Sequence, residues 1–195
     1  MKSDYFLIDA ADGTVKAGKE NVIIITSGVE LDLLDPIPEM INVNDIARSL
    51  SFQCRFGGHI NRFLSVAQHS VMVAAMAPPE LRKYALLYNA YKAYLQDISA
   101  QLRSILGPAY KILQDRFMKV IAVRFELNPD TFSEVQLYDV RAAEIEYNAF
   151  KEGKLHEWQA ECLSLKIPTV VYGAEHSESF FMSTFYSIFG SSYIN

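Results

Sequence analysis

The residues of this chain with the clearest chemical potential are a histidine, two aspartates and an arginine on separate segments. His69 lies in the run Ser65-Val-Ala-Gln-His69-Ser, Asp97 opens Asp97-Ile-Ser-Ala, and Asp139 lies in Leu-Tyr-Asp139-Val-Arg. Imidazole and carboxylate groups bind divalent transition metals and also transfer protons. Arg55 stands just before two loop glycines, and polar loop residues are more often functional than polar core residues. These residue types suit work on a small charged ligand.

Each of these residues also has a structural interpretation. His69 on a helix of Val, Ala and Met could be a hydrogen-bonded core or surface histidine. Asp97 could cap the helix that follows it. Asp139 could be one of several solvated acids, and Arg55 and His59 could simply decorate a loop. Residue type alone does not separate these interpretations, so the elements that hold the residues matter.

The order of sequence patterns predicts a single domain over residues 1–195. Residues 1–40 read as a β-rich edge, with short strands at Tyr5–Ile8 and Val22–Thr26 and a turn at Asp12-Gly13. Prolines at positions 36 and 38 end that region. We expect a helical core over 41–150 and a C-terminal extension over 151–195 that ends in a helix.

Capping residues and helical spacing predict a mainly α fold. Asn42 and Ser65 are placed to cap the first two helices, and Pro78-Pro79 opens a third. The expected helices cover residues 42–52, 65–77, 79–95, 97–106, 110–127, 131–150 and 178–189. Residues 158–165 could form another helix, and residues 168–172 could form a strand.

Several phrases in this chain resemble the HD-domain phosphohydrolases, in particular phage and bacterial members that act on nucleotides. They are Arg55-Phe-Gly-Gly-His59, Ser65-Val-Ala-Gln-His69-Ser, Ala85-Leu-Leu, and Lys92-Ala-Tyr-Leu-Gln-Asp97-Ile. The resemblance covers roughly residues 30–150. It implies an HD-domain helical bundle with a small N-terminal hairpin, and it implies a homo-oligomer, since such relatives commonly assemble.

The resemblance also assigns metal-ligand positions. His69 matches the first metal histidine of the family and Asp139 its last metal aspartate, whereas Tyr88 and Asn89 stand where the family has a His-Asp pair. A neutral amide is a much weaker ligand than a carboxylate, and a phenol is protonated near neutral pH. We therefore expect no cofactor, with a divalent transition metal as the alternative.

The remaining matched positions point to phosphate binding. Asp97 matches a carboxylate beside the scissile phosphate, Arg55 a phosphate-contacting arginine, and Lys92 a glutamate that assists the attacking water. Residues 88, 89 and 92 fall near one helix face, so the loss of two acids and the gain of an ammonium make that face more positive. We expect Arg55, His59, Arg62 and Lys92 to form an anion cradle that lacks a nucleophile.

Composition narrows the classes of function. The 195 residues carry a net charge of −5, with 21% charged and 50% hydrophobic residues, so an extended nucleic-acid partner is not expected. The two cysteines do not make a zinc signature. No run is apolar enough to span a bilayer, and the N-terminus lacks a signal-peptide core. We expect a cytoplasmic location, in the host cell if the chain is phage-encoded, and no membrane partner.

Three functions are consistent with these observations. The first is a catalytically degenerate protein that binds a nucleotide or nucleotide-like second messenger, as a phage-type sequestering protein would. The second is an active nucleotide phosphohydrolase with a reduced metal site, in which Asp97 would be catalytic. The third is a structural or protein-binding module that keeps only the fold. Because His69, Asp97, Asp139 and Arg55 all persist, a working pocket is favoured.

Overall fold

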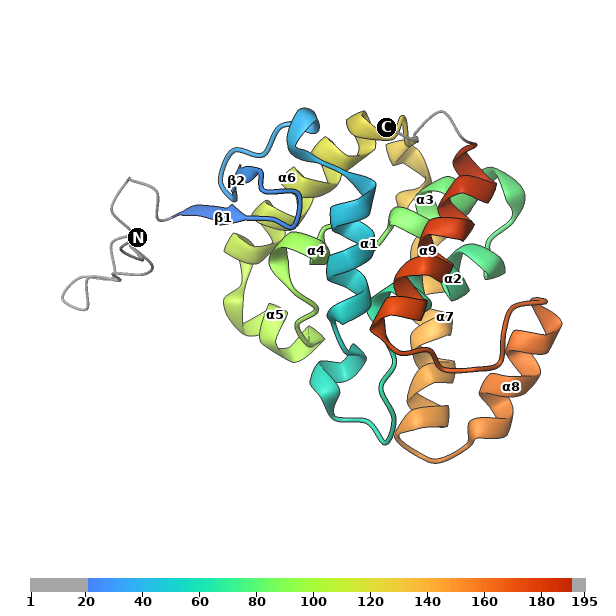
Figure 1. The fold of residues 1–195 in the computed structure, drawn as a ribbon. Coiled ribbons are helices and arrows are strands. Elements are labelled where there is room, and N and C mark those ends of the chain that lie inside the picture. Colours follow the sequence, from blue (N-terminus) through green and yellow to red (C-terminus); the bar gives the residue numbers. More distant parts are fainter. Residues whose placement is uncertain (1–20, 191–195) are drawn as a thin grey trace.

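The computed structural model describes residues 21–190, which form a mainly helical fold with a small hairpin near the N-terminal end (Figure 1). Strands β1 (Val22–Ile24) and β2 (Glu30–Asp32) pair antiparallel, with Ile23 opposite Leu31. The predicted fold class, mainly α with a small hairpin, is confirmed. The strand predicted at Tyr5–Ile8 lies outside the described residues.

Helices cover most of the described chain. The α-helices are α1 (Val43–Phe52), α2 (Val66–Met76), α3 (Arg82–Leu87), α4 (Lys92–Leu95), α5 (Ala100–Leu106), α6 (Pro108–Arg124), α7 (Phe132–Phe150), α8 (Leu155–Ser164) and α9 (Ala174–Phe189). Short 3₁₀ turns are η2 (Pro38–Met40), η3 (Arg55–Gly58), η4 (Pro79–Leu81) and η5 (Pro129–Thr131). Among residues 21–190, no helix is long and apolar enough to cross a membrane.

The two predicted helix caps are present. The side chain of Asn42 accepts a hydrogen bond from the backbone N–H of Asn44, and Ser65 Oγ accepts one from the N–H of Gln68 at 3.0 Å. Each cap satisfies an N–H that has no partner inside its helix. These contacts fix where α1 and α2 begin, and therefore where His69 lies on α2.

Helix α2 is the centre of the fold. Residues 66–74 are all buried, so this helix has no solvent face, as expected for a helix that is apolar on every side. It contacts α1, α3, α7 and α9. Figure 1 shows α1 and α9 side by side in front of it. His69 is fully buried on this helix and therefore requires partners from the surrounding helices.

The prediction of one continuous helix over residues 79–95 is wrong. The segment consists of η4, α3, a turn over residues 88–91, and α4. In the turn, Ala90 N–H donates to Leu87 C=O and Lys92 N–H donates to Asn89 C=O. These bonds span three residues instead of four and tighten the chain at that point.

The C-terminal region differs from the predictions in two places. Helix α8 contains most of the helix expected over 158–165, and α9 begins four residues earlier than expected, at Ala174 rather than at 178. Residues 168–172 are not a strand of the sheet. The aromatic side chains Phe181, Phe185 and Phe189 of α9 are buried in the core.

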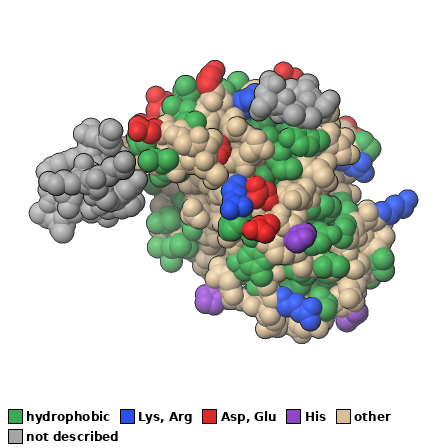
Figure 2. All heavy atoms as spheres, viewed as in Figure 1, with side chains coloured by type: hydrophobic (Ala, Val, Ile, Leu, Met, Phe, Trp, Pro, Cys, Tyr) green, Lys and Arg blue, Asp and Glu red, His purple; other side chains and the backbone are tan. Residues whose placement is uncertain are grey.

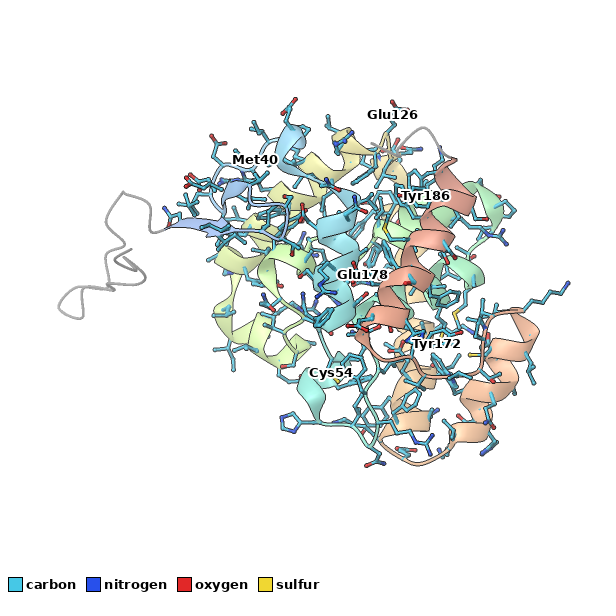
Figure 3. All side chains as sticks on the ribbon, in the orientation of Figure 1. Met40, Cys54, Glu126, Tyr172, Glu178 and Tyr186 are labelled. Atoms are coloured by element: carbon cyan, nitrogen blue, oxygen red, sulfur yellow. The ribbon has the colours of Figure 1, made fainter. Side chains whose placement is uncertain are left out.

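The surface carries mixed charge. Figure 2 shows acidic and basic side chains interspersed on this face of the described residues, without a continuous basic stripe. Figure 3 places Glu178 of α9 next to α1, where Arg48 Nη1 donates to the Glu178 carboxylate at 2.9 Å. Both cysteines, Cys54 and Cys162, are free thiols.

Candidate functional site

A cavity of about 780 Å³ lies between η3, the turn after α3, the start of α5, and α7. Most of the residues predicted as a site meet here. They are Arg55, His59, Tyr88, Asn89, Lys92, Asp97 and Asp139. His69 lies directly beneath the cavity, where its ring bonds to Asp139. Arg62 does not line this cavity but a separate cleft.

His69 is held between two carboxylates from α7. Its Nδ1 lies 2.7 Å from Glu146 Oε1, and its Nε2 lies 2.9 Å from Asp139 Oδ1. Asn89 Nδ2 donates to the same Asp139 oxygen at 2.6 Å. A ring whose two nitrogens both face carboxylates is an imidazolium that donates twice. His69 is therefore a cation that bridges two acids.

Arg55 and Lys92 hold the remaining acid of the floor. Arg55 Nε donates to Glu146 at 3.0 Å and Arg55 Nη1 donates to Asp97 at 2.9 Å, while Lys92 Nζ lies 2.8 Å from the other Asp97 oxygen. Cations and acids thus alternate along one continuous chain of contacts. The order is Lys92, Asp97, Arg55, Glu146, His69 and Asp139.

The backbone around Asp97 is fixed by Gln53 and strained at Gln96. Gln53 Oε1 accepts from the Asp97 N–H at 2.8 Å, and Gln53 Nε2 donates to the Lys92 carbonyl at 2.9 Å. Gln96 has φ 67° and ψ 158°, a conformation seldom adopted by residues other than glycine. Asp97 does not cap the next helix as its sequence suggested, because Ser99 does so.

A second strained residue, Phe56, lies next to Arg55, the partner of Asp97. Phe56, directly after Arg55, has φ 56°, and Gly57 has φ 61°. The left-handed pair turns the chain sharply at η3, which leaves the Arg55 side chain directed inward and only 7% exposed. Strained backbone therefore precedes one member of the Arg55–Asp97 pair and follows the other.

The charges of the floor stabilise one another. Burial alone would raise the pKa of Asp97, but Lys92 and Arg55 lower it below its ordinary value. For Asp139, burial acts in the same upward direction, and the hydrogen bond and charge of His69 outweigh it, so its pKa is also lowered. Burial and Arg55 act to lower the pKa of His69, but Glu146 and Asp139 outweigh them, so this pKa lies above its ordinary value. Lys92 is the exception, because burial and the charge of Arg55 lower its pKa in spite of Asp97.

These residues do not fit the transition metal that the family resemblance names as the alternative. A metal ligand offers a lone pair, whereas both nitrogens of His69 face carboxylates and carry protons. The Lys92 ammonium and the Asn89 amide present hydrogens at the same place. Within the described residues, no three His, Cys, Asp or Glu side chains form a group that could hold a metal ion. The absence of a cofactor stays a prediction.

The wall of the cavity is aromatic. Tyr88 and Phe132 pack with ring centroids 5.2 Å apart, and Phe56 and Tyr147 form an edge-to-face pair at 6.2 Å. Burial and the charge of Asp139 raise the pKa of Tyr88, so its hydroxyl stays protonated and can donate. This wall combines flat apolar surfaces with a hydrogen-bond donor.

Three further cations line the mouth of the cavity. Arg103 Nη1 donates to the Tyr91 hydroxyl at 3.1 Å, Lys111 forms an ion pair with Asp115, and Lys151 lies over the Phe56 and Tyr147 rings. Arg103 and Lys151 form no ion pair with an acid among residues 21–190. Unlike Arg55 and Lys92, these two charges are available to a ligand.

Sequence reasoning missed Glu146, the acid that joins Arg55 to His69. It is fully buried on α7, seven residues after Asp139. Seven residues are close to two helical turns, so the two acids lie on one face of α7. The sequence signal available was the position of Glu146, two helical turns after Asp139 and between Ala142 and Ala149.

Comparison with known proteins does not identify the activity. The chain is 42% identical over 100 residues, 51% of its length and 56% of the relative's, to the uncharacterized protein YfdR of Escherichia coli strain K12. It is 37% identical over 110 residues, 52% of its length and 56% of the relative's, to an uncharacterized protein of Rhodobacter capsulatus. The chain thus spans about half the length of the curated relatives it matches. No family model matches it.

Proposed function

We propose that this cavity binds a nucleotide or nucleotide-like phosphorylated small molecule and does not hydrolyse it by a metal-dependent mechanism. The observation that carries the proposal is the continuous chain of ion pairs beneath a cavity whose mouth has cations without an acidic partner among the described residues. A volume of about 780 Å³ is within the range of small-molecule sites. The HD-domain resemblance, which implies nucleotide ligands, supports the same choice.

Phosphate recognition is assigned to the mouth of the cavity. The sequence suggested Arg55 and Lys92 as the phosphate-binding cations, but each already neutralises a buried acid. Arg103 and Lys151 lack an acidic partner in the described part of the chain, and an arginine can bind phosphate with two parallel hydrogen bonds. Lys111 and His59 also line this cavity.

Base recognition is assigned to the aromatic wall. A purine or pyrimidine can stack on the Tyr88 and Phe132 surfaces, a contact worth about 1–3 kcal/mol for a base. Gln101, Gln114 and Gln136 also line the cavity, and an amide side chain supplies both donors and acceptors to a base edge. An aromatic wall with amides and cations around it suits a base joined to phosphate.

The floor is poorly suited to activate water. A general base needs an accepting lone pair near neutral pH. Both Asp97 oxygens face cations, which lower the pKa of that carboxyl, and both His69 nitrogens donate. Neither residue is therefore poised to take a proton from water. Asp97 and His69 are assigned to the framework of the site, and the active-phosphohydrolase alternative has no support from their geometry.

Ligand binding is tested with a panel of nucleoside phosphates and cyclic dinucleotides by thermal shift, followed by titration calorimetry. At least one compound is expected to raise the melting temperature, since it binds only the folded chain. Arg103→Gln should weaken that affinity by about 10-fold or more. Arg116→Gln, an exposed arginine of α6 outside this cavity, is the matched control. A panel that leaves the melting temperature unchanged contradicts the proposal.

Hydrolysis is tested separately with the compounds that bind. Each is incubated with the protein and added divalent transition metal, and phosphate release is measured. We expect the compound to be recovered intact. Steady phosphate release that disappears in Asp97→Asn would instead establish the phosphohydrolase.

A further inference from the structure

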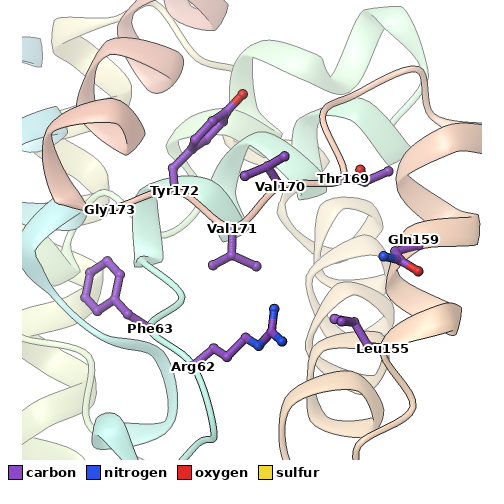
Figure 4. A pocket seen from close by; sticks show the side chains of 9 residues that line it. All are labelled: Arg62, Phe63, Leu155, Gln159, Thr169, Val170, Val171, Tyr172 and Gly173. Atoms are coloured by element: carbon purple, nitrogen blue, oxygen red, sulfur yellow. The ribbon is translucent and has the colours of Figure 1, made fainter.

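The cleft that contains Arg62 is a second candidate site, and it shares no lining residue with the cavity described above. It has a volume of about 440 Å³ and lies between the loop before α2, the first turns of α8, and the segment 169–173. Phe63, Leu155 and Val171 give it apolar walls. Figure 4 shows the Arg62 guanidinium reaching toward the space between Val171 and Leu155, with the Gln159 amide facing the same space.

One side of the backbone at Val171 is already bonded. Gln68, on α2 and almost fully buried, donates from Nε2 to the Val170 carbonyl at 2.7 Å and accepts at Oε1 from the Tyr172 N–H at 3.1 Å. The chain bends at Val170, and the two backbone groups that Gln68 bonds flank Val171. Gln68 thus satisfies the polar groups on one side of the backbone at Val171.

The opposite side of the backbone at Val171 has free polar groups. Where the groups that flank a residue point to one side of the backbone, the N–H and C=O of that middle residue point to the other side, as they alternate along a strand. Val171 is that middle residue, and within residues 21–190 its N–H and C=O make no hydrogen bond. Before the bend at Val170, the Thr169 carbonyl accepts from Trp158 Nε1 of α8 at 3.2 Å, which holds the segment against α8. Val171 lines the cleft together with Leu155 and Gln159 of α8.

The charge of the cleft selects its occupant. Arg62 is exposed and, among the described residues, forms neither an ion pair nor a hydrogen bond. A guanidinium beside apolar walls favours a carboxylate carried on an apolar chain. The free backbone N–H and C=O of Val171 favour an extended peptide backbone, which can bond both groups.

From these observations we propose that the cleft binds an extended acidic peptide of a partner protein. The peptide backbone bonds to the free N–H and C=O of Val171, its carboxylate side chain pairs with Arg62, and its apolar side chains pack on Phe63, Leu155 and Val171. Binding at this site is separate from the proposed nucleotide cavity, since Arg62 does not line that cavity and none of the other residues named here does.

The test begins with selection of short random peptides on the full chain. Wild type is expected to enrich peptides that carry Asp or Glu with apolar residues two positions away. Arg62→Glu is expected to lose those peptides and to enrich Lys or Arg at the same position. Arg116→Glu makes the same charge change on α6 and should select as wild type does. No enrichment, or the same peptides on Arg62→Glu, overturns the proposal.

A second measurement tests the backbone contact. A selected peptide is labelled, and its affinity is measured by fluorescence polarisation. Arg62→Ala should weaken it by about 10- to 100-fold, as for loss of a hydrogen-bonded charge. Val171→Pro removes the free N–H and should also abolish binding, while unchanged far-ultraviolet circular dichroism shows that the fold is kept. Full affinity in folded Val171→Pro overturns the backbone contact.

Discussion

The floor of the cavity and the outer cleft use positive charge in opposite ways. At the floor, Arg55 is 7% exposed and is held by two acids. In the cleft, Arg62 is exposed and no acid of the described chain pairs with it. The two arginines are seven residues apart and were predicted to share one phosphate cradle. In the structure, Arg55 lines the cavity and Arg62 lines the separate cleft.

This difference shows that burial, more than residue type, decides whether a charge can serve a ligand. A buried charge is retained only when it is paired, because its desolvation is otherwise too costly. Arg55 and Lys92 meet that condition through Asp97, so a ligand has to compete with the protein for them. An exposed guanidinium such as that of Arg62 is solvated by water and needs no acidic partner within the protein. Changes at the two sites should therefore have different effects on folding.

The largest effect is expected from Glu146→Gln, which removes the acid shared by Arg55 and His69. Loss of one partner of a buried ion pair costs about 3–5 kcal/mol of unfolding free energy, since the other charges stay buried without it. Denaturant unfolding measures the loss. Glu144→Gln, an exposed acid on the same helix, should change stability by less than about 0.5 kcal/mol. Similar losses in both variants would mean that the floor is not a compensated network.

A smaller loss is expected from Gln68→Ala, which frees the segment that borders the cleft. The variant removes two hydrogen bonds, to the Val170 carbonyl and from the Tyr172 N–H, and should cost about 1–3 kcal/mol. Amide hydrogen exchange at Tyr172 should also become faster, because its N–H loses its acceptor. Gln159→Ala, an exposed glutamine of the same cleft, is the control and should leave that exchange unchanged.

The protonation of His69 gives the floor a pH dependence that the cleft lacks. Because the folded-state pKa of His69 lies above its ordinary value of 6.5, its stabilising contribution is complete below about pH 6.5. It is lost as the pH rises through the folded-state pKa. The acids act in the opposite sense, since their lowered pKa values make their contribution disappear as the pH falls.

Histidine signals in NMR spectra, recorded with rising pH, provide the measurement. One ring is expected to titrate above the usual histidine range, and its titration should move to lower pH in Glu146→Gln. Denaturant unfolding over the same pH range should show stability falling as that ring loses its proton. A His69 ring that titrates below 6.5 would contradict the doubly donating imidazolium.

The smallest effect on folding is expected from Arg62→Ala. The guanidinium contacts no acid in residues 21–190, so the unfolding free energy should change by less than about 0.5 kcal/mol. The same variant is expected to lose affinity for the selected peptide. A large loss of stability would show that Arg62 has a structural role, and the contrast between the two arginines would fail.

Local signals in the sequence were sufficient for much of the fold. The capping side chains of Asn42 and Ser65 marked the starts of α1 and α2, because a cap is decided by residues three or fewer positions away. The position of Ser65 then fixed His69 on α2. The resemblance to HD-domain proteins pointed to seven of the residues that line the cavity, which spacing alone does not bring together.

Long-range pairing was beyond the reach of those signals. Glu146 bonds to Arg55 and His69 across separations of 91 and 77 residues, and no pattern of neighbouring residues in the sequence indicates either contact. The tight turn over residues 88–91 was also missed, because its residues are compatible with a continuous helix. The strand expected over residues 168–172 is absent: the chain bends at Val170, and its backbone bonds to the Gln68 side chain instead of to another strand.

Gln96 imposes an unusual pattern of mutational tolerance next to Asp97. Its φ of 67° and ψ of 158° fall where a side chain is disfavoured by about 1–3 kcal/mol, yet its carbonyl accepts from the Tyr110 hydroxyl at 3.3 Å through the backbone alone. Glycine keeps that acceptor and removes the steric conflict. When Gln96 is replaced by every other amino acid, glycine should destabilise the fold least, and valine or isoleucine should be among the most destabilising. Within regular helices and strands, by contrast, glycine is usually one of the more destabilising replacements.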